Sequence, residues 1–293
     1  MNTNNYVRTD LAAESPIIEN EQLSDGITAT ENKLDMASIS TVEITNKNGE
    51  KAIGKPIGTY ITISFDKIWR LDDITQKRLS YIISENIKKL ANIKNEKLNI
   101  LICGLGNRYI TSDAVGPLVI KDITATSHLE KADNELFKLL NSHSISAISP
   151  GVIGQTGIET LELIRGAVNS VNSDVLIVID ALCSKSVDRL GSTVQICNTG
   201  ISPGSGIGNK RHAINKDTVG IPVIAIGVPT MVSSSTLVYD ALEKASITDI
   251  SDKLTDILEN GKSFFVTLNE NDVVISSLAS LIASALNSAL TLE

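Results

Sequence analysis

Two aspartates, each close to the end of an apolar run, are the residues of this sequence best suited to chemistry. Asp113 closes the loop that begins at Gly104 after the run 98–103, and Asp180 ends the run 175–179. Such a carboxylate is partly desolvated, so its pKa should rise unless it has a partner. Two of them can activate water, either as a pair that shares one proton or around a metal ion. Simple capping of a turn or helix is the other role open to each.

Two glycine-rich loops add backbone donors and positive charge. Backbone N–H groups in the loops 150–160 and 203–211 can stabilise an oxyanion, and they can equally form plain turns. The basic pair that ends the second loop is able to bind a substrate carboxylate, to pair with the aspartates, or to remain solvated. The candidates for oxyanion stabilisation or substrate binding are Gly154, Gly157, Gly204, Gly206, Lys210 and Arg211.

Other kinds of site have weaker support in the sequence. The chain lacks a G-x-S-x-G motif, and its three cysteines and three histidines lack the spacing of a zinc site. The loop after Gly104 lacks the third glycine of a dinucleotide motif, and 203–211 lacks the Gly-Lys-Ser/Thr order of a phosphate loop. We therefore expect no cofactor and no zinc site, while the expectation of no catalytic metal comes only from the family resemblance described below. A metal-dependent protease or amidase that uses the two aspartates as ligands, and a nucleotide-binding α/β protein, remain the alternatives.

Composition narrows the range of partners. The 293 residues carry a net charge of −8 and only 3% aromatic residues, which argues against direct binding of nucleic acid. The N-terminal residues are polar, without the apolar stretch of a signal peptide, and the few cysteines suit a reducing cytoplasm. The uncharged stretch 273–292 is long enough to cross a membrane, but its serines and missing aromatic belt favour a buried C-terminal helix. We expect no membrane partner.

The elements around the two aspartates predict an α/β fold, with a mostly parallel sheet between helices. Continuous apolar runs indicate strands that are buried on both faces, and ligands collect at the carboxyl ends of such strands. The expected strands lie at 98–103, 145–148, 175–179, 193–197 and 223–226, and the helical segments at 114–125, 157–170, 235–260 and 270–290.

The N-terminal third has a different pattern. Residues 41–45 and 60–65 predict an added β-hairpin, and 66–93 predicts a long amphipathic helix. Residues 1–40 are polar and irregular, which is typical of a flexible or loosely docked arm.

Six motifs in this order make the sequence resemble the germination proteases of spore-forming bacteria. The first is Tyr-Val-Arg-Thr-Asp-Leu-Ala-Ala-Glu at 6–14. The second combines Gly-Leu-Gly-Asn at 104–107 with Thr-Ser-Asp-Ala-Val-Gly-Pro at 111–117. The others lie at 150–160, at 179–182 (Ile-Asp-Ala-Leu), at 198–211 and at 220–230.

The resemblance implies an aspartic-type endopeptidase, similar in fold to hydrogenase-maturation proteases, whose catalytic residues are Asp113 and Asp180. It implies a cytoplasmic enzyme of the forespore or spore core that degrades small acid-soluble spore proteins during germination. It further implies a homotetramer that is made as an inactive, self-processed precursor. A non-catalytic spore-associated binding protein is a further alternative, because Ser233 stands where the family commonly has Asp.

The same resemblance predicts where the precursor is cut. The family cleaves after an acidic residue that is followed by a hydrophobic residue and alanine, and Asp10-Leu11-Ala12 has this form. We therefore expect self-cleavage between Asp10 and Leu11, with a propeptide at 1–10, an arm at 11–40 and a single peptidase domain at 41–293.

Overall fold

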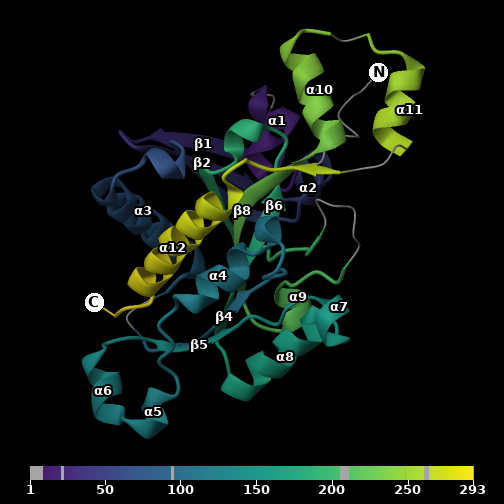
Figure 1. The fold of residues 1–293 in the computed structure, drawn as a ribbon. Helices are drawn as coiled ribbons and strands as arrows, with labels where there is room; N and C mark the ends of the chain where they lie inside the picture. Colours follow the sequence, from purple (N-terminus) through teal and green to yellow (C-terminus); the bar gives the residue numbers. More distant parts are fainter. Residues whose placement is uncertain are drawn as a thin grey trace.

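A mixed β-sheet organises the chain in the computed structural model, which describes residues 9–20, 23–93, 96–204, 211–247, 249–260 and 264–292 (Figure 1). Within these residues the strand order is β1-β2-β3-β7-β8-β6-β4-β5, and β9 pairs with β8 beside this path. The strands are β1 (Ile27–Lys33), β2 (Ala37–Ile44), β3 (Gly58–Phe65), β4 (Asn99–Gly104), β5 (Ser144–Ile148), β6 (Val175–Cys183), β7 (Thr193–Cys197), β8 (Val223–Ser233) and β9 (Phe265–Val266).

The sheet has a parallel half and an antiparallel half. Strands β5, β4, β6 and β8 run parallel to one another, whereas β1, β2, β3 and β7 pair in antiparallel fashion and β7 joins β8 antiparallel. The parallel strands are nearly continuous apolar runs, which suits burial on both faces. The predicted α/β class is confirmed, although the parallel character holds for one half of the sheet and the sheet as a whole is mixed.

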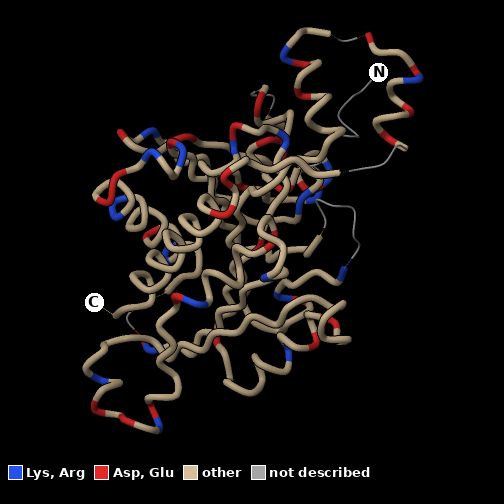
Figure 2. Tube along the Cα trace, viewed as in Figure 1, with Lys and Arg blue, Asp and Glu red and all other residues tan. Residues whose placement is uncertain are grey.

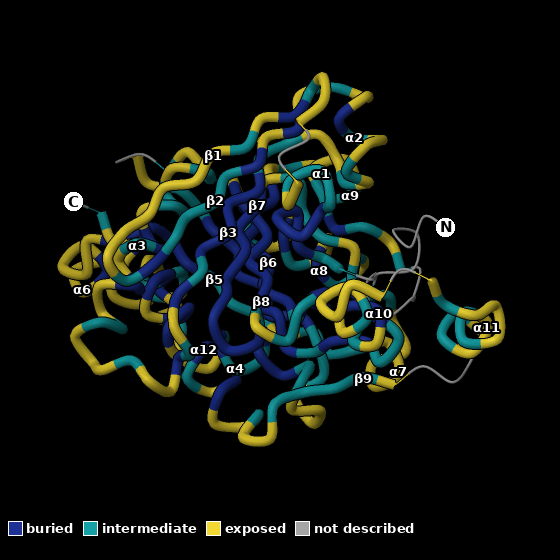
Figure 3. Tube along the Cα trace, turned by 90° about the horizontal axis from the view of Figure 1, so that it is seen from above, coloured by how far each residue is buried: buried dark blue, intermediate teal, exposed yellow. Residues whose placement is uncertain are grey.

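Helices cover both faces of the parallel half. On one face α3, α4 and α12 enclose the larger apolar cluster, and α8 and α9 lie over the other face (Figure 1). The helices are α1 (Pro16–Glu19), α2 (Lys47–Ile53), α3 (Asp73–Ala91), α4 (Val115–Lys121), α5 (Leu129–Ala132), α6 (Asn134–Leu139), α7 (Ile153–Thr156), α8 (Thr160–Val171), α9 (Lys216–Val219), α10 (Ser234–Lys244), α11 (Asp252–Asn260) and α12 (Asn271–Ala289). The central strands are the most deeply buried part of the molecule (Figure 3), and charged residues lie mainly on outer helices and loops (Figure 2).

Helix α12 shows how the C-terminal apolar stretch is used. Among the described residues it is the helix that is long and apolar enough to cross a membrane. Its apolar side chains, such as Leu278 and Ile282, are fully buried against α3 and α4. The helical segment expected over 235–260 is divided into α10 and α11, because Ser246 takes a left-handed conformation (φ 58°) just after α10 ends.

Residues 11–40 differ from the arm that their composition predicts. They form a short 3₁₀ helix η2 (Ala12–Glu14), helix α1, the edge strand β1 and the start of β2. Strand β1 buries only Ile27, because it lies at the edge of the sheet and exposes most of its residues. A polar edge strand has the composition of a disordered segment, so composition could not separate the two. The hairpin partners β2 and β3 pair as expected, but α2 connects them where a turn was predicted.

Candidate active site

Three neighbouring strands place one acidic residue, one glycine and one amide in a row. In the sheet register Asp180 of β6 is opposite Gly227 of β8, and Gly227 is opposite Gln195 of β7. Paired residues point to the same face, so the side chains of Asp180 and Gln195 rise on the same side, about 10 Å apart across two strand spacings. Gly227 has no side chain to stand between them, and a Cβ there would lie 2.2 Å from Leu182 Cδ1.

Asp113 reaches this region from the loop after β4. It ends the 3₁₀ helix η4 (Thr111–Asp113), and its Oδ2 accepts a 2.7 Å hydrogen bond from the backbone N–H of Asn107. Gly106 makes the close approach possible: its φ is 108°, and a Cβ there would lie 2.0 Å from the carbonyl oxygen of Asp113. Gln155 of α7 holds Asn107 in turn, through a 2.9 Å bond to its side-chain oxygen. The loop therefore fixes the carboxyl group of Asp113 by backbone geometry.

The two aspartates line one small cavity together with Asp10. The cavity has a volume of about 50 Å³, and its wall includes Gly204 and Met231. Burial raises the pKa of Asp180 well above its usual value, and the nearby charge of Asp113 raises it further. Burial also raises the pKa of Asp113, against the opposing effects of the Asn107 N–H and the charge of Arg211. Two carboxyl groups with raised pKa values in one cavity have the chemical properties of an acid–base pair.

Residues 9–15, the N-terminal segment, run through this region. The backbone N–H of Asp10 donates to the carbonyl oxygen of Cys183 at 2.9 Å, and Cys183 N–H donates to Asp10 Oδ2 at 2.9 Å. The pairing of β6 with β8 shifts register between Leu182 and Cys183, so β6 ends in an irregularity at this point. Bulges of this kind occur next to active sites, where they turn strand groups towards a ligand.

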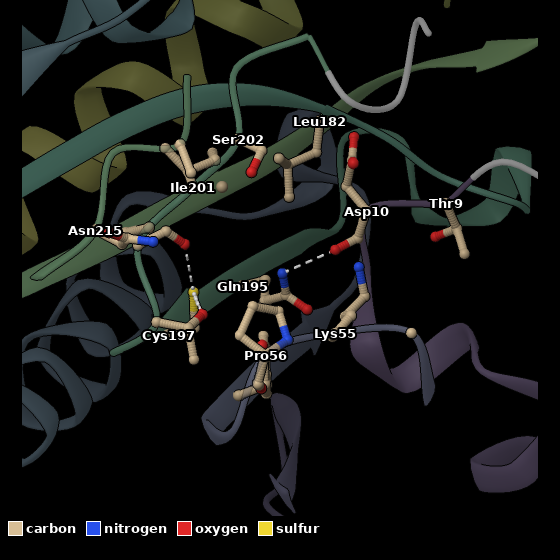
Figure 4. Close-up of a pocket in the computed structure, with 17 residues that line it drawn as sticks. Thr9, Asp10, Lys55, Pro56, Leu182, Gln195, Cys197, Ile201, Ser202 and Asn215 are labelled. Atoms are coloured by element: carbon tan, nitrogen blue, oxygen red, sulfur yellow. Dashed lines mark hydrogen bonds between the residues drawn. The ribbon is translucent and has the colours of Figure 1, made fainter. Parts of the chain in front are cut away.

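A second, larger cavity lies on the other side of Asp10. It has a volume of about 370 Å³ and shares part of its wall with the smaller cavity: Asp10, Leu182, Ile201 and Ser202. Gln195 and Lys55 line the larger cavity, and Figure 4 shows both side chains approaching Asp10. Gln195 Nε2 donates to the carbonyl oxygen of Asp10 at 3.2 Å, and Ala12 N–H donates to Gln195 Oε1 at 2.8 Å. Burial lowers the pKa of Lys55, while the charge of Asp10 acts in the opposite direction.

Glu14 anchors the far end of the N-terminal segment. Its side chain is 2% exposed and accepts hydrogen bonds from the backbone N–H groups of Lys185, at 2.7 Å, and Ser186, at 3.2 Å. Thr9 Oγ1 donates to the same carboxylate, and Arg189 Nε lies 3.8 Å from it. Burial raises the pKa of Glu14 and these hydrogen bonds act against that shift. The segment is therefore held at both ends, by Asp10 and by Glu14.

The structure brings some of the sequence-predicted site residues together and leaves others apart. Asp113, Asp180, Asp10 and Gly204 line the small cavity, and Leu11 is fully buried beside Asp10. The charge of Arg211 acts on both carboxyl groups. Gly154 and Gly157 are exposed on and after α7, outside the residues that line either cavity. Gly206 and Lys210 lie outside the described residues.

Sequence reasoning missed four residues that contact this region. Gln195 is the one with a readable signal, because a polar side chain interrupts the apolar strand 193–197. Lys55 and Glu14 offer no comparable pattern, since each depends on segments that are distant in sequence. Asn107 contacts Asp113 through its backbone N–H, six residues away, and a backbone group leaves no mark in the residue type.

Comparison with known proteins agrees with the sequence motifs. The sequence model of the germination protease family matches residues 7–247. A germination protease of Caldanaerobacter subterraneus subsp. tengcongensis is 38% identical over 97% of this chain and 94% of that protein. The germination protease of Clostridium acetobutylicum is 34% identical over 98% of this chain and 95% of that protein. Among solved structures, the [NiFe] hydrogenase maturation protease HycI of Thermococcus kodakarensis KOD1 aligns with 70% of this chain and 98% of its own, with 17% identity and a TM-score of 0.36.

Proposed function

Because the chain belongs to the germination protease family, we propose that it is an aspartic-type endopeptidase that begins the degradation of small acid-soluble spore proteins during germination. One observation carries the proposal of an aspartate mechanism. Asp10, the residue before the expected cut, lines the same cavity as Asp113 and Asp180. A peptide bond that matches the family's cleavage preference thus lies next to two carboxyl groups with raised pKa values.

The environments of the two aspartates suggest different roles. Asp180 is the more deeply buried, and its strongly raised pKa favours the protonated form. Asp113 has a backbone N–H and the charge of Arg211 to support its ionised form. In our mechanism Asp113 takes a proton from water, and the resulting hydroxide adds to the carbonyl carbon. Asp180 donates its proton to the carbonyl oxygen as negative charge develops there. The C–N bond then breaks as Asp113 passes its proton to the leaving nitrogen, and one hydroxyl proton of the intermediate returns to Asp180.

The contacts of Asp10 support a preference for an acidic residue before the cut. Its carboxylate accepts from Cys183 N–H, so a backbone donor is already directed at an acidic side chain. The next two residues, Leu11 and Ala12, are fully buried, which suits a hydrophobic residue followed by a small one. The N-terminal segment therefore occupies the position that we assign to the substrate.

The same arrangement is what a self-processing precursor requires. With Asp10 at the cavity and Leu11 buried beside it, cleavage between them would happen within one chain and would not depend on protein concentration. We expect removal of residues 1–10, assembly as a homotetramer and action in the spore core, as in the family resemblance.

Incubation of the purified full-length chain with a purified small acid-soluble spore protein tests this function. We expect cuts after acidic residues, located by mass mapping of the products, and loss of the first ten residues from the chain, measured by intact mass. Asp113→Asn and Asp180→Asn variants are the controls for a contaminating protease.

Two results would count against the proposal. An intact spore protein after incubation with the processed chain would remove the substrate assignment. Activity that a chelator abolishes and a divalent cation restores would favour a metal-dependent enzyme with the same aspartates as ligands.

A further inference from the structure

We propose that Gln195 is a catalytic residue of this site, whose amide binds the carbonyl oxygen of the bond being cut and whose side-chain oxygen binds the N–H of the second residue after the cut. The inference rests on the proposed function, since it takes Asp10–Leu11 as the scissile bond. It adds a residue that is neither one of the two aspartates nor part of the glycine-rich loops.

The two hydrogen bonds of Gln195 lie on either side of that bond. Its Nε2 donates to the carbonyl oxygen of Asp10 at 3.2 Å, and its Oε1 accepts from Ala12 N–H at 2.8 Å (Figure 4). One planar amide thus holds the peptide before and after the cut. The carbonyl oxygen that would gain negative charge during hydrolysis already faces a hydrogen-bond donor, which is the arrangement of an oxyanion hole.

The burial of Gln195 gives the hydrogen bonds of its amide a large effect on the free energy. Gln195 is 6% exposed, and its chain neighbours Val194 and Ile196 are fully buried. A buried amide is costly unless its polar atoms are hydrogen-bonded. Both hydrogen bonds given above go to the N-terminal segment, so the amide has its partners when a peptide lies in the site. This is the behaviour of a group that binds a peptide backbone.

Gln195 and Asp180 lie in the same row of residues across the sheet. Gly227 separates it from Asp180 in the register of β7, β8 and β6. Gly227 has no side chain, and the side chain of Leu182 covers it: a Cβ there would lie 2.2 Å from Leu182 Cδ1. Leu182 lines both cavities. Lys55 lines the same cavity as Gln195 and adds a positive charge close to Asp10. Negative charge that develops on this oxygen before it is protonated would be stabilised from the antiparallel half of the sheet.

The test uses Gln195→Met and Gln195→Glu in the full-length chain, with Thr193→Val as the matched control. Thr193 lies two residues earlier in β7, is also buried, and its hydroxyl has no hydrogen-bond partner. We measure the first-order rate of self-processing by intact mass. We also measure kcat and KM of the processed enzyme with a peptide of the sequence 9–14.

We expect Gln195→Met to lower kcat by about a hundredfold, the usual effect of losing an oxyanion donor. The kcat of Gln195→Glu should be equally low at neutral pH. It should rise as the pH falls, because a protonated carboxyl group can donate a hydrogen bond to the carbonyl oxygen. A residue that only supported the strand would not produce this recovery. Thr193→Val should keep the wild-type kcat.

A second measurement examines the other hydrogen bond. A peptide with N-methylalanine at the position of Ala12 lacks the N–H that Gln195 accepts, so the wild-type enzyme should bind it about tenfold less tightly. The Gln195→Met variant should treat the two peptides alike. The comparison of the two peptides with the wild-type enzyme tests this hydrogen bond even if the Gln195 variants fold poorly, because it needs no variant.

The outcomes separate this inference from the proposed function. Wild-type protein that cleaves neither itself nor the spore protein contradicts the proposed function. Wild-type protein that cleaves normally, with a Gln195→Met variant within twofold of its kcat and no effect of N-methylation, contradicts the role of Gln195 alone.

Discussion

The parallel half of the sheet and the antiparallel half approach the N-terminal segment with different chemical groups. From the parallel half come Asp180, near the end of β6, and Asp113, after β4. From the antiparallel half come Gln195 on β7 and Lys55, which lies between α2 and β3. One side offers carboxyl groups with raised pKa values, and the other offers a neutral amide and a cation.

This division follows from the direction of the strands. Parallel strands present their carboxyl ends at one edge, where loops can bring acidic groups together. An antiparallel strand such as β7 passes the same place in mid-strand, so it contributes a side chain held rigidly in the middle of the sheet. The N-terminal segment lies where the two halves of the sheet meet. Substitutions in one half therefore test the contribution of that half to cleavage.

The largest effect is expected from removing the acids of the parallel half. Asp113→Asn and Asp180→Asn should each lower the rate of peptide cleavage by about 10³-fold or more, because proton transfer to and from the reacting groups is lost. Cleavage of the purified spore protein measures the rate. Asp217→Asn, an exposed aspartate of α9, is the control and should leave the rate unchanged. Full activity of either site variant would exclude that aspartate from the mechanism.

A smaller effect is expected when the position of an acid is changed and its chemistry is kept. In Gly106→Ala the new Cβ would meet the carbonyl oxygen of Asp113 at 2.0 Å and force the loop to move. A shift of about 1 Å in a catalytic group costs about a hundredfold in rate, so kcat should fall by that amount. Gly166→Ala in α8 has open space around the new methyl group and should have no effect. Equal kcat values for the two variants would show that the loop does not position Asp113.

The rate of self-processing should depend on the hydrogen bonds that hold the N-terminal segment to the residues just after β6. Glu14→Ala leaves the N–H groups of Lys185 and Ser186 without their acceptor, and a hydrogen bond to a charged group is worth about 1.5 kcal/mol or more. We expect self-processing to slow by about tenfold, while cleavage of a separate peptide changes little. Glu19→Ala removes an exposed carboxylate from Lys185 and is the control. Slower cleavage of the separate peptide would place Glu14 in the catalytic step instead of in the anchoring of the segment.

The smallest effect concerns stability. The folded-state pKa of Asp180 is raised, so the stability linked to its protonated form is present below about pH 4 and is lost as the pH rises through that pKa. The Asp180→Asn variant has no ionisable group at this position, so its stability does not fall in this way as the pH rises. The variant should therefore unfold at a Tm higher by about 2–4 °C at neutral pH, and the difference should vanish towards pH 4. A variant less stable than the wild type at neutral pH would show that Asp180 is ionised and partnered in the folded state.

Much of this architecture could be predicted from local patterns. The run 175–179 predicted the buried strand that carries Asp180, because continuous apolar residues suit a strand covered on both faces, although β6 continues past Asp180 to Cys183. The long helix over 66–93 was also expected, and α3 occupies most of it, since its apolar spacing follows a helical period. These features depend on residues that are close in sequence.

Other features depended on contacts that no local pattern records. Residues 11–40 join the sheet and the site because β1 finds a partner in β2, and because Glu14 finds donors more than 170 residues away. Lys55 faces the cavity only because α2 and β3 lie beside the N-terminal segment. Composition describes such residues as polar and cannot say what they contact.

By itself the sequence determined the α/β class and the two aspartates after buried strands, since both follow from hydrophobic patterning and from the place where apolar runs end. The tertiary structure decided that β7 enters antiparallel, that Gly227 lies between Asp180 and Gln195 in the sheet, and that Asp10 lies in that region. The physical reason is distance along the chain. Hydrogen bonds and cavities that join residues 10, 113, 180 and 195 exist only after the sheet has brought these segments together.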